Sequence, residues 1–175
     1  MARITVNTLG DQPHIYLTMD TDVANVYDGS SSTTWVSTTN ALDVTCLQDI
    51  TITNSTGVFS WTDFCQLDMQ KITTPADNSV ETNIVIEDTD FFGTVGSAGT
   101  NAVELGVNGL SSQKQYVQFV VVMNGDLDGI VGKRWYQGTG YITSIAPTVN
   151  PEAPVWVSPM TIAVTGDFTN GVVAS

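Results

Sequence analysis

The chain has 175 residues, which predicts one domain with its own hydrophobic core. Eighteen acidic residues against five basic ones give a formal net charge of −13, and this excludes binding to a phosphate backbone as the main function, because such binding needs clustered Lys and Arg. The longest apolar run, Phe119–Met123, is too short to span a bilayer. The amino terminus has no apolar core of the kind found in signal peptides, so we expect no membrane insertion.

Few residues are suited to catalysis or metal binding. The chain contains one histidine, His14, and two cysteines, Cys46 and Cys65, so it has no multi-His or four-Cys metal site. It also has no nucleophile elbow, phosphate-binding loop or dinucleotide fingerprint. The turn at 124–129 resembles the start of a calcium loop, but its twelfth position is Trp135 where a Glu is needed, which favours a hairpin turn. We expect no enzyme, no cofactor and no metal; a hydrolase using carboxylates alone is a distant alternative.

Apolar residues alternate with polar ones along much of the chain, which predicts strands. Residues 115–123 are apolar on both faces after Gln118, as expected for a central strand, and an Asn-Gly turn leads from them to the next strand. In chain order, the expected strands cover 42–46, 49–53, 79–87, 115–123, 134–145 and 155–165.

A short helix is expected within 88–105, where acidic residues suit a helix amino terminus but three glycines weaken the pattern. The polar tract 29–40 is predicted to be a loop or an edge hairpin. Residues 59–69 fit two structures: a helix capped by Ser60 and Asp63, or an alternating strand.

The order of these elements resembles the major tail tube proteins of long-tailed bacteriophages. Leu42–Thr53 looks like that family's early strand, and Ser79–Phe92 like its strand that runs into a short helix with acidic residues at its start. The closing antiparallel strands correspond to Gln118–Met123, Gly138–Ile145 and Pro159–Gly166. The resemblance implies an antiparallel β-sandwich or barrel with one short flanking helix and extended loops or termini.

The resemblance further implies a structural virion protein that stacks as hexameric rings into a hollow tail tube, through which phage DNA passes without specific binding. Expected partners are other copies of the chain and the tape measure, tail terminator and distal tail proteins. The protein would be in the virion tail, and in the host cytoplasm during assembly. The net negative charge fits a lumen that repels phosphates.

We therefore expect a single domain over 1–175, with a core at about 12–167 and terminal arms at 1–10 and 168–175. The candidates for facing the lumen are Glu81, Asn83, Glu87, Asp126, Asp128, Thr161 and Thr165. The candidates for subunit contacts are Ile4, Val6, Trp35, Phe168, Val172 and Val173.

A second function is consistent with the same composition. Four Trp and five Tyr residues could form the platform of a carbohydrate-binding or adhesive β-sandwich that decorates a surface. Core and subunit contacts explain the same aromatics more simply. Particle size separates the two functions, because a tube protein forms rings or filaments and a binding module stays small.

Overall fold

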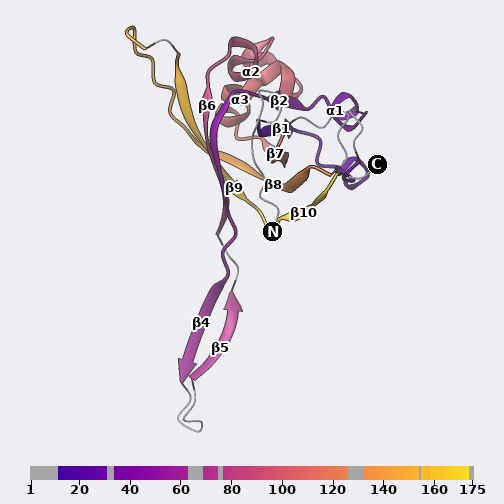
Figure 1. Ribbon diagram of the computed structural model, residues 1–175, viewed down its shortest axis with the longest axis vertical. Helices are drawn as coiled ribbons and strands as arrows, with labels where there is room; N and C mark the ends of the chain where they lie inside the picture. Colours follow the sequence, from indigo (N-terminus) through magenta and orange to yellow (C-terminus); the bar gives the residue numbers. More distant parts are fainter. Residues whose placement is uncertain are drawn as a thin grey trace.

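The computed structural model describes residues 12–30, 34–62, 69–74, 77–125, 132–153 and 155–173 (Figure 1). The strands are β1 (His14–Thr18), β2 (Leu42–Val44), β3 (Leu47–Thr53), β4 (Gly57–Thr62), β5 (Met69–Thr74), β6 (Asn78–Val85), β7 (Tyr116–Val122), β8 (Arg134–Ile145), β9 (Val157–Val164) and β10 (Thr169–Val172). The helices are α1 (Thr34–Thr39), α2 (Asp88–Phe92) and α3 (Ala102–Ser112), with short 3-10 turns at Val23–Asn25 and Gly96–Ala98. None of the helices in these ranges is long and apolar enough to cross a membrane.

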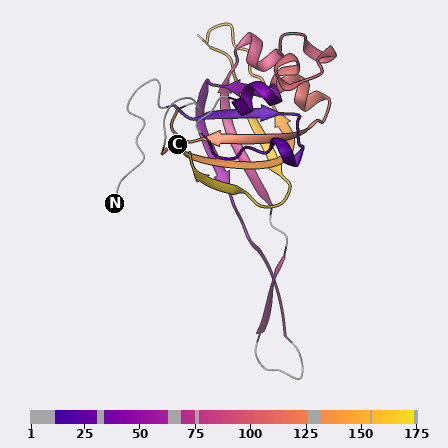
Figure 2. The same ribbon diagram turned by 90° about the vertical axis from the view of Figure 1, so that its right-hand side faces the viewer.

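The described strands other than β4 and β5 form one antiparallel sheet that folds into two layers, in the order β2-β1-β7-β8-β9-β6-β3 with β10 also paired to β8. Figure 2 shows the strands of the first layer (β2, β1, β7, the start of β8, and β10) crossing those of the second layer (the end of β8, β9, β6 and β3). The long strand β8 belongs to both layers. At Gly140 a side-chain carbon would lie 2.0 Å from the carbonyl oxygen of Ala163, so only glycine allows β8 to approach β9 this closely. The predicted mainly β, antiparallel fold is confirmed.

The main core lies between the two layers and under α3. Leu17 and Phe119 from the first layer are fully buried against residues such as Val80 and Ile162 from the second, and Leu105 of α3 closes one end. β7 lies between β1 and β8, as the run of apolar residues on both of its faces predicted.

The outer face of the first layer carries a second, smaller core, which we call the Tyr27 cluster. Its members are Tyr16, Tyr27, Trp35, Ala41, Val120, Val122, Trp135 and Val173. Tyr27 lies edge-on to both tryptophans, at 5.6 Å from Trp35 and 5.3 Å from Trp135 between ring centroids. The last part of the polar tract was expected to be a loop or an edge hairpin, but it forms the helix α1. The Tyr27 cluster explains this difference, because Trp35 is buried in it and Thr39 Oγ1 donates a hydrogen bond to the Trp35 carbonyl. These two interactions outweigh the low helix propensity of Ser and Thr.

The Tyr27 cluster makes the stability of the protein sensitive to alkaline pH. The Tyr27 side chain is 2% exposed and its hydroxyl donates to the Ser30 carbonyl at 2.7 Å. Burial, with a smaller contribution from Asp28, raises the pKa of Tyr27 from 10.0 to about 12. Between these values the unfolded chain loses the tyrosine proton and the folded chain keeps it, so the free energy of unfolding falls as the pH rises.

We expect this titration to remove about 2 kcal/mol of stability between pH 10 and pH 12. Urea unfolding across this range should show a smaller loss for Tyr27→Phe than for the wild type. Tyr141→Phe is the control, because Tyr141 is 44% exposed and should leave the loss unchanged. If the free energy of unfolding fell equally with pH in the wild type and in Tyr27→Phe, the loss would not come from the titration of Tyr27.

The expected arm at 168–175 is wrong for the residues that the structure describes. Residues 169–172 form β10 and pair with β8 from Thr169↔Gln137 to Val172↔Arg134. The strand was missed because it is short, polar and contains Gly171, where a side chain would come within 2.7 Å of the Trp135 ring. Val173 is 1% exposed, and its backbone nitrogen donates to the Lys133 carbonyl at 2.7 Å.

Val173→Ala should lower the free energy of unfolding by about 2 kcal/mol, because it removes two buried methyl groups and leaves a cavity. The neighbouring Val172 is 41% exposed, so Val172→Ala should cost about 0.5 kcal/mol or less. Denaturant unfolding of the two variants gives the comparison. Similar losses for both would mean that Val173 does not belong to the domain core.

The short helix expected within 88–105 is α2, and a second helix that the sequence did not predict, α3, begins at Ala102 and runs to Ser112, beyond that segment. α2 begins at Asp88 as predicted, and it ends at Gly93, whose φ is 76°. A side-chain carbon at Gly93 would lie 2.2 Å from the Glu104 carbonyl oxygen, so this glycine lets the two helices pack closely. The glycines that weakened the helix pattern therefore mark the place where the chain turns.

β4 and β5 form a separate two-stranded hairpin that projects far from the two layers (Figure 1). The register pairs Phe59 with Ile72 and Val58 with Thr73, so these pairs lie on opposite faces of the hairpin. Of the two structures left open for 59–69, the strand is correct where the chain is described. Val58 is 58% exposed and Ile72 is 55% exposed, and both faces of the hairpin therefore carry an exposed apolar residue.

Candidate functional site

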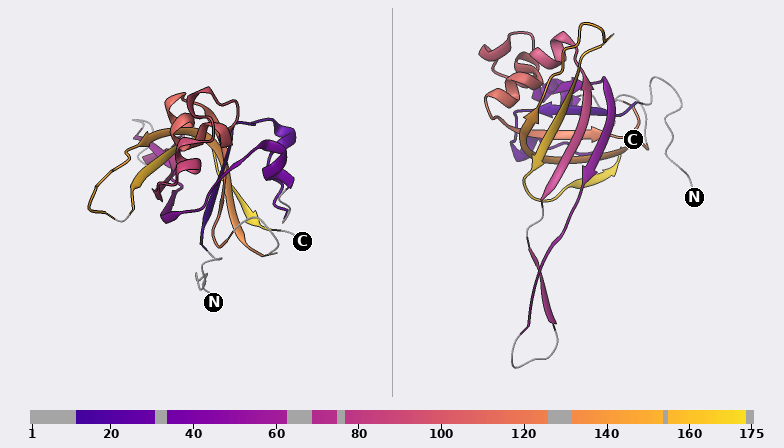
Figure 3. Two further views of the ribbon diagram at one scale, coloured as in Figure 1. Left: turned by 90° about the horizontal axis from the view of Figure 1, so that it is seen from above. Right: turned by 90° about the vertical axis from the view of Figure 1, so that its left-hand side faces the viewer.

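A polar surface covers the outer side of the second layer, and we call it the polar face. It consists of Asp49 and Thr51 from β3, Glu81 and Asn83 from β6, and Pro159 and Thr161 from β9. Strand alternation places these residues opposite the core-facing Val80, Ile84 and Ile162. The right-hand view of Figure 3 shows the three strands side by side.

The register aligns the polar face in rows across the strands. Thr51, Glu81 and Thr161 form one row, and Asp49, Asn83 and Pro159 form the next. Three of the lumen candidates, Glu81, Asn83 and Thr161, are therefore brought together on one face. Strand alternation predicted that each of them lies on the polar side of its strand, but only the register shows that they are neighbours.

Asp49, Thr51 and Pro159 are the polar-face residues that were not among the lumen candidates, and Asp49 is the charged one of the three. Its Oδ1 accepts a hydrogen bond from the Asn83 backbone nitrogen at 2.8 Å, and its Oδ2 accepts one from Asn83 Nδ2 at 2.8 Å. The carboxylate is exposed and held in a fixed position by these bonds. The pattern that could have revealed it is the alternation of Asp49, Thr51 and Thr53 with Ile50 and Ile52.

The polar face has a negative electrostatic character. Asp49 and Glu81 are both exposed on it. The described residues of β3, β6 and β9 include no Lys, Arg or His. A surface of this charge repels phosphates and attracts cations.

The other lumen candidates are not among the six residues that define the polar face. Glu87 precedes α2 at the end of the molecule where the helices pack. Thr165 follows β9, is exposed, and its backbone nitrogen donates to the Thr139 carbonyl at 2.7 Å. Asp126 and Asp128 lie outside the described residues.

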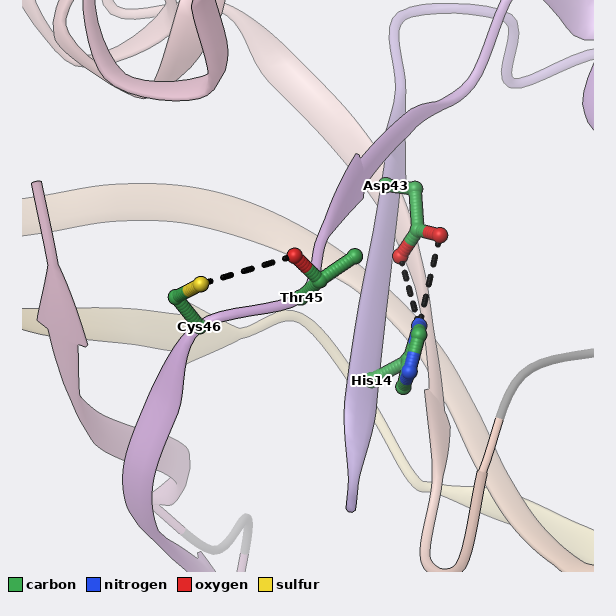
Figure 4. Close-up of polar contacts among 4 residues, drawn as sticks. All are labelled: His14, Asp43, Thr45 and Cys46. Carbon is green, nitrogen blue, oxygen red and sulfur yellow. Dashed lines mark hydrogen bonds and ion pairs between the residues drawn. The ribbon is translucent and has the colours of Figure 1, made fainter. Parts of the chain in front are cut away.

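Figure 4 shows the pair His14 and Asp43, and Cys46, whose sulfur accepts a hydrogen bond from the Thr45 hydroxyl at 3.7 Å. His14 Nδ1 lies 3.0 Å from Asp43 Oδ1, across the paired strands β1 and β2. The Cys46 thiol donates to Glu87 Oε1 at 3.0 Å, and this bond, together with burial, raises the thiol pKa. A raised pKa makes the thiol a weaker nucleophile at neutral pH. In the described part of the chain, no group of three or more His, Cys, Asp or Glu residues could hold a metal ion.

Several subunit-contact candidates make contacts within their own chain. Trp35 is 9% exposed, and its Nε1 donates to the Asn25 carbonyl at 2.5 Å. Phe168 is half-buried, with its ring centroid 6.1 Å from that of Phe119. Val172 remains exposed on β10, whereas Ile4 and Val6 lie outside the described residues.

Comparison with protein-family models gives no match for this sequence, and comparison with curated proteins gives none either. Comparison with solved structures does give matches. The tail of an empty GTA particle with C6 symmetry matches with a TM-score of 0.51 and 12% identity over 89% of this chain and 93% of that chain. The SPP1 tail tube matches with a TM-score of 0.52 and 12% identity over 98% of this chain and 81% of that chain.

A third match comes from a different kind of tail assembly. The sixfold-symmetrised baseplate of the anti-feeding prophage matches with a TM-score of 0.51 and 8% identity over the full length of both chains. At these identities the likeness concerns the fold alone. The chain therefore has the fold of tail tube and baseplate proteins, as the resemblance in its sequence predicted.

Proposed function

We propose that the chain is a structural subunit of a virion tail tube, which assembles as stacked hexameric rings around a lumen that conducts DNA. The observation that carries this proposal is the fold shared, over nearly the whole chain, with subunits of tail and baseplate assemblies. Two of those structures have sixfold symmetry, which supports a hexamer. Tape measure, tail terminator and distal tail proteins would be the other partners in the virion.

Ring closure is supported by two strand edges of the second layer. Among the described residues β3 pairs only with β6, so its other edge is available. At the opposite side of the layer, residues 142–145 of β8 pair with β9 and lie beyond the last β7 partner, Tyr141. Pairing one edge with the other edge of a second copy is a head-to-tail contact, and such contacts generate a ring when the rotation from copy to copy closes.

Stacking of rings is supported by the β4–β5 hairpin. A two-stranded hairpin is at best marginally stable in water without further packing. Val58 and Ile72 are exposed on it, and the hairpin extends far beyond the two layers. A second copy of the chain, in the same or the adjacent ring, is the partner that covers it in this proposal.

The polar face is the proposed lumen wall. Rings built through the edges of the second layer would carry one copy of this face per subunit, so Asp49 and Glu81 would each recur around the pore. Carboxylates on the wall would repel DNA phosphates and keep the DNA from adhering. Glu87 lies beyond β6, at the start of α2, whereas Thr165 directly follows β9 with the same alternation as Thr161 and stays a candidate for the lumen.

Negative-stain electron microscopy of the purified chain tests the assembly. Rings and hollow filaments are expected, with no hydrolase activity in the same preparation. If the protein stays monomeric at all concentrations and virions contain no tubes, the result would instead favour the carbohydrate-binding or adhesive module.

A further inference from the structure

An open groove of about 370 Å³ lies between the end of α3 and the edge of β8, and we call it the β8-edge groove. Ser111 and Lys114 form one side of it, and residues 141–143 of β8 form the other. The last β8 residue that pairs with β7 is Tyr141. In the described part of the chain, no strand pairs with residues 142–145 on this side, so the groove opens where the partner strand of β8 ends.

The surface of the groove is mostly apolar, although it is open to solvent. Tyr141 is 44% exposed beside it, and its ring centroid lies 5.0 Å from that of Tyr116. Exposed aromatic residues next to an apolar surface are typical of places that a protein partner covers.

The core is incomplete at the opposite edge of the same layer. Ile142, Ile162, Val80 and Ile52 form one row across β8, β9, β6 and β3. Val80 and Ile162 in the middle of the row are fully buried, whereas Ile52 on the edge strand β3 is only half-buried, as is Ile50. Another sheet edge placed beside β3 would complete the burial of both side chains.

The two edges also carry opposite charges. Lys114 is exposed at the β8-edge groove, and the described residues 111–114 and 141–145 contain no acid. Asp49 is exposed on β3, and this strand contains no base. Contact between unlike edges is therefore attractive, whereas contact between two β3 edges would bring carboxylates together.

We propose that the β8-edge groove binds the β3 edge of a second copy of the chain, with Ile50 and Ile52 of that copy against its apolar wall. The attraction between Lys114 and the acidic β3 edge selects this pairing over contact between like edges. The inference rests on the proposed function, because it names the surfaces that close the ring.

Charge reversal at the groove is the first test. Lys114→Glu should reduce the number of rings and tubes in negative stain about tenfold or more at low salt, because both edges are then acidic. Adding Asp49→Lys to the same chain should restore them, since the edges again differ in charge. The matched control is Arg134→Glu, which makes the same charge change at an exposed position of the first layer and should leave assembly unchanged. Circular dichroism of each variant shows whether it is folded.

Cross-linking is the second test, and it needs no change of charge. In a chain whose Cys46 and Cys65 are replaced by serine, Thr143→Cys and Thr51→Cys are prepared separately and mixed before assembly. Both positions are exposed, Thr143 at the groove and Thr51 on β3. A short bis-maleimide should give dimers in the mixture and none with either variant alone. Ser37→Cys, exposed on α1, replaces Thr143→Cys in the control mixture, which should give no dimer.

The outcomes separate this inference from the proposed function. Rings of the wild type, together with normal assembly of Lys114→Glu and no dimer in the mixture, would overturn the inference and leave the tube function standing. Dimers from Thr51→Cys alone would place two like edges together and would also overturn it. A wild-type chain that stays monomeric at all concentrations would overturn both.

Discussion

Shortening the β4–β5 hairpin should abolish tube growth while the protomer stays folded. The strands that support the hairpin, β3 and β6, already pair at Thr53↔Ser79. Replacing residues 55–76 by one glycine would join them through a four-residue loop of Asn54, Gly, Asp77 and Asn78, a common hairpin length. The two layers lose no core residue by this change, so far-ultraviolet circular dichroism and the unfolding midpoint should remain close to those of the wild type.

A point substitution tests the apolar contact more finely. Ile72→Asp would place a carboxylate on an exposed hairpin position that the proposal buries between copies, where an unpaired charge is costly. Tubes should be lost or at least tenfold fewer in negative stain. The matched control is Val23→Asp. Val23 is 86% exposed and belongs to the 3-10 turn Val23–Asn25, which is not part of the hairpin. Normal tubes from the shortened chain would contradict a stacking role for the hairpin.

The two layers could be predicted because local pattern and tertiary packing agree there. Strands 42–44, 116–122, 134–145 and 157–164 lie where apolar alternation or a doubly apolar run predicted them. The prediction failed where packing overrides local preference. α1 forms from Ser and Thr because Trp35 is buried against Tyr27, and β10 forms around a glycine because the Trp135 ring occupies the space of a side chain.

The candidate site was predictable in part. Alternation separated Glu81 and Asn83 from the core-facing Val80 and Ile84, but it did not say which strands are neighbours. The order β9-β6-β3 joins segments distant in sequence, and no local pattern encodes that order. Asp49 joins the site through this order, because β3 pairs with β6 and its carboxylate bonds to Asn83.

Lysine at Glu81 should leave tubes intact and block or slow genome delivery. Glu81 is exposed in the middle of the polar face, opposite Thr51 and Thr161, so the longer side chain displaces no core residue. In a ring of identical subunits the change repeats around the pore, and each ammonium can contact a phosphate. The contacts add up along the tube, so we expect DNA delivery to fall about tenfold or more at low salt.

The control for this change is Glu152→Lys, which makes the same charge difference in the exposed connection between β8 and β9. It should leave delivery unchanged, since the net charge of the tube is then the same but the proposed lumen wall is not altered. Raising the salt from about 50 to about 200 mM should restore delivery by the Glu81→Lys particles, because phosphate contacts weaken steeply with salt. Equal delivery by both lysine variants at low salt would show that the polar face does not line the DNA path.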